Sequence, residues 1–455
     1  MLQRFKSMNK TVCLFLTGLS AILPIKAANV YFTGGSLETI SITPEKSTGL
    51  DALYVVFDDK LLSEMRISGI SPDATIMKYS NLGGGYAEPV SFRYDGGEAV
   101  VENPAGDLGY LVASEGKTTY FWVVNYAAHY LQMNALTASI NQDCDNTIID
   151  FNGNASAIHY YTIDGRPVEL SRQIRARYNN LEWDEASRSY IQTSEQKELS
   201  NISSSFALYP PLYCNSVVTL SGDRFLDQWG RGITINSPVI HANGLAVNTS
   251  AEQTNLPSDS ETDSNIIKTD VDGIGGSAPV DVEFRAYTTD AVVHNEWQIA
   301  SDQNFDYIDY RFNEQNLDYT FNEEGTYYIR FVGSNADGTC ETTGDTYTVG
   351  VGASQLKIPN AFTPNGDGIN DEWKVAYRSL SSFSCTIFDR YGNELFRFTD
   401  PSKGWDGKYK GKNVKPGVYF YVIEATGTDG KKYKKGGDIN IINAKRYGNE
   451  NSPVN

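Results

Sequence analysis

The sequence predicts an all-β protein, organised as a string of antiparallel β-sandwich domains. Short runs of alternating or continuously apolar residues recur along the chain, and turn-forming residues separate them. The chain contains 29 Tyr, 20 Phe and 40 Gly, a composition typical of strands and turns rather than helices. At 455 residues it is too long for one hydrophobic core, so we expect several domains.

Residues 1–28 have the pattern of a secretory signal peptide. A basic start is followed by an apolar run over residues 11–25, and Ala27 and Ala28 supply small residues for cleavage. The run is too short and too early for a membrane span, and no later apolar stretch approaches the roughly 20 residues that a transmembrane helix needs. We therefore expect an exported protein and leave residues 1–28 out of the fold.

The net charge of −18 argues against general electrostatic binding of nucleic acid. The charge is uneven, because residues 358–446 are slightly basic and the acidity lies in the rest of the chain. An acidic body mainly favours solubility.

Two β domains are expected in the N-terminal half. Over residues 29–140, short strands alternate with turns such as Gly34-Gly35 and Pro72-Asp73. Residues 141–245 contain further strands, with Cys144, a tryptophan and Cys214 in the order found in immunoglobulin-like sandwiches, which this segment resembles.

Export makes disulfides possible, and Cys144 with Cys214 is the best candidate pair because both lie in one predicted domain. Leu212 stands where immunoglobulin-like domains have a tyrosine, two residues before the second cysteine. Cys385 lies in an alternating strand and is expected to be a buried free thiol.

Residues 246–277 are polar and acidic and are predicted to be a linker. Residues 278–353 form the next predicted module. They resemble the PKD domain, a small immunoglobulin-like sandwich, at Trp297, residues 319–321, residues 325–327, Asn335 and Gly338. That resemblance implies a spacer or binding module, and Trp297 is expected to pack in its core.

The sharpest pattern lies in residues 354–443, where residues 358–371 read IPNAFTPNGDGIND. This segment resembles the gliding-motility-associated C-terminal domain family, the type B sorting domain of the type IX secretion system of Bacteroidetes-type bacteria. The matching residues are Phe362, Pro364, Asn365, Gly366, Asp367, Gly368, Asn370, Asp371, Arg390, Gly392, Trp405, Gly407, Pro416 and Gly417. Residues 444–455 follow as a polar tail.

The resemblance implies export, surface attachment at the outer membrane, and contact with the type IX secretion machinery and an outer-membrane β-barrel partner. Eight lysines between Lys408 and Lys435 are expected either to protect strand edges or to dock an acidic partner.

The same motif could hold a cation. Asn365, Asp367, Asn370 and Asp371 are hard oxygen donors around two glycines, which suits Ca²⁺. Asn and Asp also form turns without any metal, and we favour that interpretation. No other cofactor is expected.

No catalytic motif surrounds any of the four histidines. The sequence therefore favours a non-catalytic surface protein with an adhesive or structural role, and a glycan or protein ligand for residues 29–245. One alternative is a secreted hydrolase with its active site in residues 29–245. The other is an accessory component of the secretion or gliding machinery.

Overall fold

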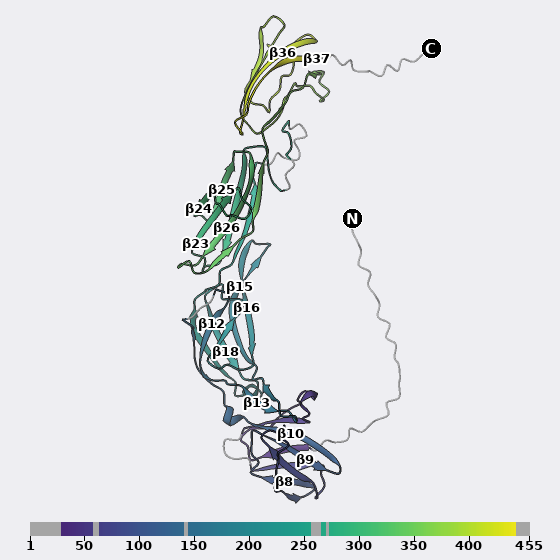
Figure 1. The fold of residues 1–455 in the computed structure, drawn as a ribbon, viewed down its shortest axis with the longest axis vertical. Coiled ribbons are helices and arrows are strands. Elements are labelled where there is room, and N and C mark those ends of the chain that lie inside the picture. Colours follow the sequence, from purple (N-terminus) through teal and green to yellow (C-terminus); the bar gives the residue numbers. More distant parts are fainter. Residues whose placement is uncertain (1–28, 58–62, 141–143, 256–264, 270–272, 443–455) are drawn as a thin grey trace, which may run out of the picture.

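The computed structural model describes residues 29–57, 63–140, 144–255, 265–269 and 273–442. The predicted signal peptide and polar tail lie outside these ranges. The described chain is almost entirely β-structure, arranged as four modules in an elongated row from the N-terminal to the C-terminal end (Figure 1). The predicted all-β fold class is confirmed. Within the described ranges, no helix has the length and hydropathy needed to cross a membrane.

The first module packs two sheets face to face. One sheet has the order β1 (Asn29–Thr33), β4 (Glu64–Ser68), β8 (Glu98–Glu102), β7 (Arg93–Asp95). The other has the order β2 (Ile40–Ile42), β3 (Ala52–Val56), β10 (Lys117–Asn125), β9 (Leu108–Ser114), β5 (Thr75–Tyr79), β6 (Glu88–Pro89), and the short 3-10 helices η1 (Lys46–Thr48) and η2 (Tyr126–His129) flank it.

Both faces of β10 are buried, which explains its continuous apolar run. Phe121 and Val123 point into the sandwich core of the first module. Trp122 and Val124 point the other way, into a core shared with the second module. The first module is therefore joined to the second through a hydrophobic core.

The second module contains three sheets and one short helix. The first sheet has the order β11 (Gln132–Ala138), β12 (Thr147–Asn154), β17 (Ser205–Leu208), and the second is the pair β13 (Ile158–Tyr161) and β14 (Pro167–Leu170). The third sheet has the order β16 (Ser189–Leu199), β15 (Ile174–Asp184), β18 (Ser216–Gly222), β19 (Ile233–Ile240). The helix is α1 (Arg224–Gln228).

The structure moves the first predicted domain boundary. β11 lies within the predicted 29–140 domain, yet it pairs with β12 along most of its length. Met133 and Leu136 from β11 are buried in the core of the second module. The division therefore falls before Gln132, because pairing with β12 outweighs closeness in sequence to the first module.

The third module is a sandwich of β20 (Val247–Gln253), β22 (Val280–Thr288) and β25 (Asn316–Phe321) against a larger sheet. That sheet has the order β21 (Ile274–Gly276), β28 (Tyr347–Val351), β26 (Gly325–Ser334), β23 (His294–Ala300), β24 (Tyr310–Phe312), and β27 (Glu341–Thr343) also pairs with β26. Trp297 is fully buried between the sheets, as its predicted core role requires, and donates a hydrogen bond to the Gln315 carbonyl at 3.1 Å.

The predicted linker over residues 246–277 is wrong at both ends. β20 pairs with β22 over its whole length, and β21 pairs in parallel with β28. Val247 and Ala251 pack against the core of the third module, although polar residues surround them in the sequence. The centre of the expected linker, residues 256–264, lies outside the described ranges.

The fourth module is built on one five-stranded sheet. Its order is β30 (Ala361–Phe362), β37 (Lys432–Ile441), β36 (Gly417–Gly427), β32 (Leu380–Phe388), β33 (Glu394–Phe398), and two small pairs, β29 (Gln355–Lys357) with β31 (Ala376–Arg378) and β34 (Lys408–Tyr409) with β35 (Lys412–Asn413), accompany it. Along β36, Ile423 is fully buried while Val418, Phe420 and Val422 are about half exposed, so only one face of the sheet is covered.

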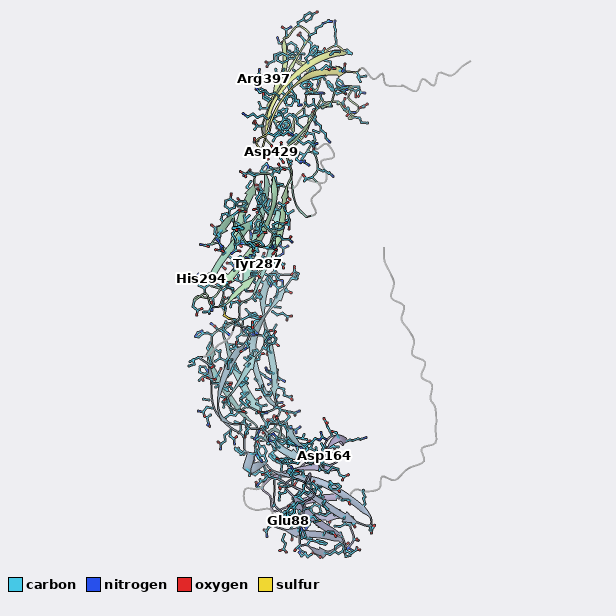
Figure 2. The ribbon with its side chains drawn as sticks, in the orientation of Figure 1. Glu88, Asp164, Tyr287, His294, Arg397 and Asp429 are labelled. Atoms are coloured by element: carbon cyan, nitrogen blue, oxygen red, sulfur yellow. A yellow bond between two sulfur atoms is a disulfide. The ribbon has the colours of Figure 1, made fainter. Side chains whose placement is uncertain are left out.

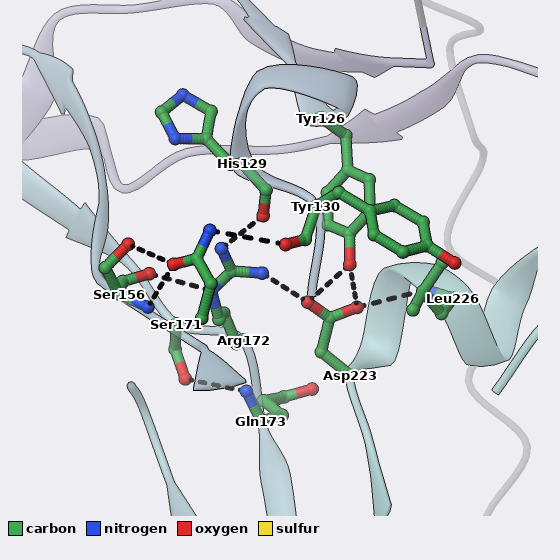
Figure 3. A network of polar contacts seen from close by, with 10 residues as sticks. Tyr126, His129, Tyr130, Ser156, Ser171, Arg172, Gln173, Asp223 and Leu226 are labelled. Atoms are coloured by element: carbon green, nitrogen blue, oxygen red, sulfur yellow. Dashed lines mark hydrogen bonds and ion pairs between the residues drawn. The ribbon is translucent and has the colours of Figure 1, made fainter. Parts of the chain in front are cut away.

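A buried ion pair fixes the joint between the first and second modules (Figure 3). Arg172 Nη1 donates to Asp223 Oδ2 at 2.7 Å, and neither side chain has any exposed surface. Asp223 also accepts from the Tyr126 hydroxyl at 2.9 Å, and Arg172 donates to the carbonyl of His129. Burial, followed by the Asp223 charge, raises the pKa of Tyr126 far above its ordinary value.

The structure corrects the predicted disulfide. Cys144 is bonded to Cys340, with their Cα atoms 5.8 Å apart, and Cys214 is a partly buried free thiol. Cys340 belongs to the third module, so sequence order within one predicted domain could not reveal the pairing. Cys385 is a fully buried free cysteine, as predicted, and burial raises the pKa of its thiol to about 12.

Defined side-chain contacts are also present between the second and third modules and between the third and fourth modules. The ring centroids of Trp183 in the second module and Tyr287 in the third module are 5.3 Å apart. At the joint between the third and fourth modules, the fully buried Ser379 accepts from the Ala278 amide at 3.0 Å and donates to the Gly352 carbonyl at 2.6 Å. Figure 2 labels Asp429 at this joint, where it accepts a hydrogen bond from Ser354. Each module is therefore held to the next by ordered contacts.

Candidate functional site

The motif residues of the fourth module gather at one end of its sheet. Phe362 pairs with Ile441, which in turn pairs with Gly417 on the next strand. Phe420 pairs with Phe388, the last residue of β32 before the turn that holds Arg390 and Gly392. Segments separated by more than fifty residues in the sequence thus meet at this end, which we call the motif end.

Two tryptophans form the centre of the motif end. Trp373 and Trp405 exchange backbone hydrogen bonds of 2.9 and 3.1 Å, and both side chains are fully buried. Their indole N–H groups are satisfied by the Pro359 and Lys408 carbonyls at 2.7 and 2.9 Å. The Trp405 ring also packs against Phe362, with ring centroids 5.7 Å apart. The motif tryptophan is therefore a packing residue.

Gly407 needs to be glycine at this position. Its φ of +72° is in the left-handed region, which side chains with a Cβ seldom occupy. A Cβ there would lie only 3.1 Å from Pro364 and 3.3 Å from Phe362. Gly407, Pro364 and Phe362, three separate parts of the predicted motif, are thus in direct proximity.

The 363–371 loop is organised by the carboxylate of Asp371. Its two oxygens accept hydrogen bonds from the Gly366 and Gly368 amides at 2.6 and 2.7 Å. These bonds, with the Gly366 bond as the largest cause, hold the pKa of Asp371 below its usual range. Gly366 and Gly368 both have positive φ, so the loop needs glycine at these positions.

The other polar side chains of the loop are also occupied by turn contacts. Asp367 Oδ1 accepts from the Ile369 amide at 2.8 Å, and Asn365 Oδ1 accepts from the Asp367 amide at 2.9 Å. Asn370 contributes its backbone carbonyl, which accepts from the Thr363 amide. This geometry favours the turn-forming interpretation of Asn365, Asp367, Asn370 and Asp371, and calcium binding stays the untested alternative. Among the described residues, no three His, Cys, Asp or Glu side chains form a metal-binding group.

The turn at Arg390 and the start of β36 complete the motif end. Asp389 accepts from the Tyr391 and Asn393 amides at 2.8 and 2.9 Å, which closes the turn. The Arg390 guanidinium lies 5.1 Å from the centre of the Tyr391 ring, and that ring is 76 % exposed. Pro416 and Gly417 lead into β36. This turn therefore presents a cation and an aromatic ring to solvent.

The lysines of the fourth module do not form one surface. The β34–β35 pair carries Lys408 and Lys412 next to Gly407, at the motif end. Lys434, by contrast, pairs with Glu424, which is about 23 Å along β36 from Gly417. Two separate basic groups are present, and Lys408 and Lys434 each have a carboxylate partner.

Sequence reasoning found no site in the third module, yet its larger sheet carries a hollow of about 640 Å³. Its lining includes His294, Glu296, Gln298, Arg311 and Arg330. Arg311 lies on β24, and the other four residues alternate with core residues along β23 and β26. The pattern in the sequence is therefore that of any half-exposed strand.

Comparison with known families assigns two segments of the chain. Residues 356–441 match the CHU_C type IX secretion signal domain, which agrees with the predicted sorting module. Residues 137–237 match the fibronectin type III domain, an immunoglobulin-like fold, which supports the predicted character of the second module. The likeness of residues 278–353 to the PKD domain is not confirmed. The C-terminal match supports a secreted protein that is sorted by the type IX system.

The wider comparisons add little. A search of curated proteins found no match. Among solved structures, the chain is similar to the crystal structure of dimeric latent PorU from Porphyromonas gingivalis at 9 % identity and a TM-score of 0.16. The match covers 72 % of this chain and 35 % of that one, so this chain spans about a third of its length.

Proposed function

We propose that this chain is a non-catalytic surface protein of adhesive or structural function, delivered and attached through its fourth module. The match of residues 356–441 to a type IX secretion signal domain carries the delivery part of the proposal. Under this proposal the type IX machinery and an outer-membrane β-barrel partner engage the fourth module, and the other three project outward from the outer membrane.

The elongated row of modules supports a projecting role (Figure 1). A shared hydrophobic core, a disulfide and a buried serine hold the three successive joints. Such joints suit a protein that must keep distant modules at a fixed separation from the cell. The partner would meet the motif end, where Tyr391 and Ile369 are 76 % and 67 % exposed.

A hydrolase is the main competing function, and Asp223, the buried carboxylate of the N-terminal half, does not support it. Asp223 is fully buried and its carboxylate is committed to Arg172, Tyr126 and the Leu226 amide. A substrate cannot reach this carboxylate without opening the joint, so the network serves structure. A screen of the secreted chain against glycan and peptide polymers, scored for both binding and cleavage, tests this part. Cleavage that survives purification and disappears on substitution of one carboxylate in residues 29–245 would refute the non-catalytic assignment.

Cell fractionation tests the sorting part. The full chain is expected in the outer-membrane and surface fractions. The chain without residues 356–455 is expected to accumulate in the periplasm.

A further inference from the structure

We infer that the hollow on the third module is a binding site for a neutral oligosaccharide. The hollow lies on the outer face of the sheet formed by β23, β24, β26 and β27, and Figure 2 labels His294 on this module. Its volume of about 640 Å³ is within the range of ligand sites. The inference goes beyond the proposed function, which concerns delivery to the surface.

The floor of the hollow is a connected row of planar polar groups. Gln298, only 6 % exposed, donates from Nε2 to Glu296 Oε1 at 2.6 Å and accepts at Oε1 from Arg330 Nε at 2.8 Å. Arg311 forms an ion pair with the same Glu296. The side chains therefore hold each other in place before any ligand arrives, which lowers the entropy cost of binding.

Arg330, one member of this row, also stacks on an aromatic ring. The Arg330 guanidinium lies 4.1 Å from the centre of the Phe305 ring, and Phe305 is only 9 % exposed. Together with the Nε hydrogen bond to Gln298, this stacking holds the guanidinium from two sides. Arg330 is thus a fixed donor rather than a freely moving surface cation.

The charges of the lining favour a neutral ligand. Two glutamates, Glu296 and Glu341, and two arginines, Arg311 and Arg330, line the hollow, so its formal charge is zero with His294 neutral. The whole chain carries −18, which disfavours a polyanion. A ligand with many groups that both donate and accept hydrogen bonds is the best complement to this row.

The same features disfavour a peptide. Peptides that bind sheets pair with a strand edge or insert apolar side chains into pockets. The hollow lies over a sheet face, where the strand backbones already bond to one another through β23 and β26. Val293 and Val332 are the only aliphatic residues of its lining. Sugar hydroxyls, spaced to bridge neighbouring planar side chains, fit such a polar floor.

The test uses the secreted full chain, residues 29–455, and isothermal titration with cellohexaose, maltohexaose, laminarihexaose and mannohexaose. Binding of at least one is expected, with a Kd that changes less than twofold between 50 and 300 mM NaCl. Thr343→Trp, which fills the hollow, and Arg311→Gln, which breaks the row, should each weaken that binding at least tenfold.

Matched controls lie on the opposite sheet of the same module. Thr320→Trp and Arg285→Gln alter an exposed threonine and an ion-paired arginine there, and both should bind within twofold of the unaltered chain. The inference is overturned if none of the four sugars binds, or if Thr343→Trp and Arg311→Gln bind as well as the controls. Tighter, salt-sensitive binding of poly-L-glutamate at the same residues would also overturn it. Surface delivery of Thr343→Trp tests the proposed function separately and is expected to be normal.

Discussion

Cys144 and Cys340 are 196 residues apart in the sequence and form a disulfide that joins the second module to the third. The bond attaches the loop before β27, next to the hollow, to the segment between β11 and β12 of the second module. A covalent connection at this joint restricts how far the two modules can separate, as the proposed projection from a surface requires.

Removing this disulfide should weaken the joint. We expect Cys144→Ser with Cys340→Ser to lower the free energy of unfolding by about 2–5 kcal/mol, because the unfolded chain gains freedom. Guanidinium titration, followed by small-angle scattering of the native chain, measures the loss of stability and any bending. Cys214→Ser is the matched control and should change neither. Equal stability and shape for the double variant would contradict the assigned pairing.

The buried pair at the first joint predicts a non-additive effect. Arg172→Met should cost about 3–5 kcal/mol, because it leaves the Asp223 charge buried without its partner. Changing both residues, with Asp223→Leu added, should recover most of that loss despite the missing cap on α1. Denaturant unfolding of the two single variants and the double variant measures the coupling. Costs that simply add would show that the two charges do not depend on each other.

The motif tryptophan predicts a local stability loss. Trp405→Ala should destabilise the fourth module by about 3–5 kcal/mol, since a fully buried ring is replaced by a cavity. Tyr391→Ala, in the same module but 76 % exposed, should change stability by less than about 0.5 kcal/mol. Hydrogen exchange of the β36 and β37 amides in the full chain measures the change in stability of the fourth module for each of the two variants. Unchanged exchange in Trp405→Ala would exclude a packing role.

The 363–371 loop should respond to acid. The folded pKa of Asp371 is lowered, so its contribution to stability is present above the unfolded value, about 3.9, and is lost as the pH falls through the folded pKa. Hydrogen exchange should show the Gly366 and Gly368 amides protected at pH 6 and progressively exposed below pH 4, after correction for intrinsic rates. Asp371→Asn should expose them at both pH values. Protection that does not depend on pH would rule out the carboxylate as the organising group.

The response to calcium distinguishes a turn from a cation site in the 363–371 loop. Because both oxygens of Asp371 already accept backbone hydrogen bonds, we expect melting of the full chain to be the same in calcium and in chelator, within about 1 °C. A higher melting temperature in calcium that disappears in Asp371→Asn would instead establish a cation site in this loop.

The features that could be predicted from the sequence are those that depend on residues close to one another in the chain. The alternation around Trp297, the burial of Cys385 and the glycine turns of the 363–371 loop all follow from residues close in sequence. The joints did not follow. Cys340 and β20 have their partners in distant segments, and β11 pairs with β12 across the boundary that the turn residues predicted. The hollow was missed for a different reason: Gln298 and Arg330 become a site only when β23 and β26 pair in the observed register.

Surface delivery tests the central claim most directly. Intact cells are treated with an external protease, and the fraction of the chain that is degraded is compared for the full chain and for the chain without residues 356–455. A periplasmic protein serves as the control for cell integrity and must stay undegraded. We predict that most of the full chain is degraded and that the shortened chain is protected. Equal degradation of both chains on intact cells would contradict the assignment of the fourth module as the sorting signal.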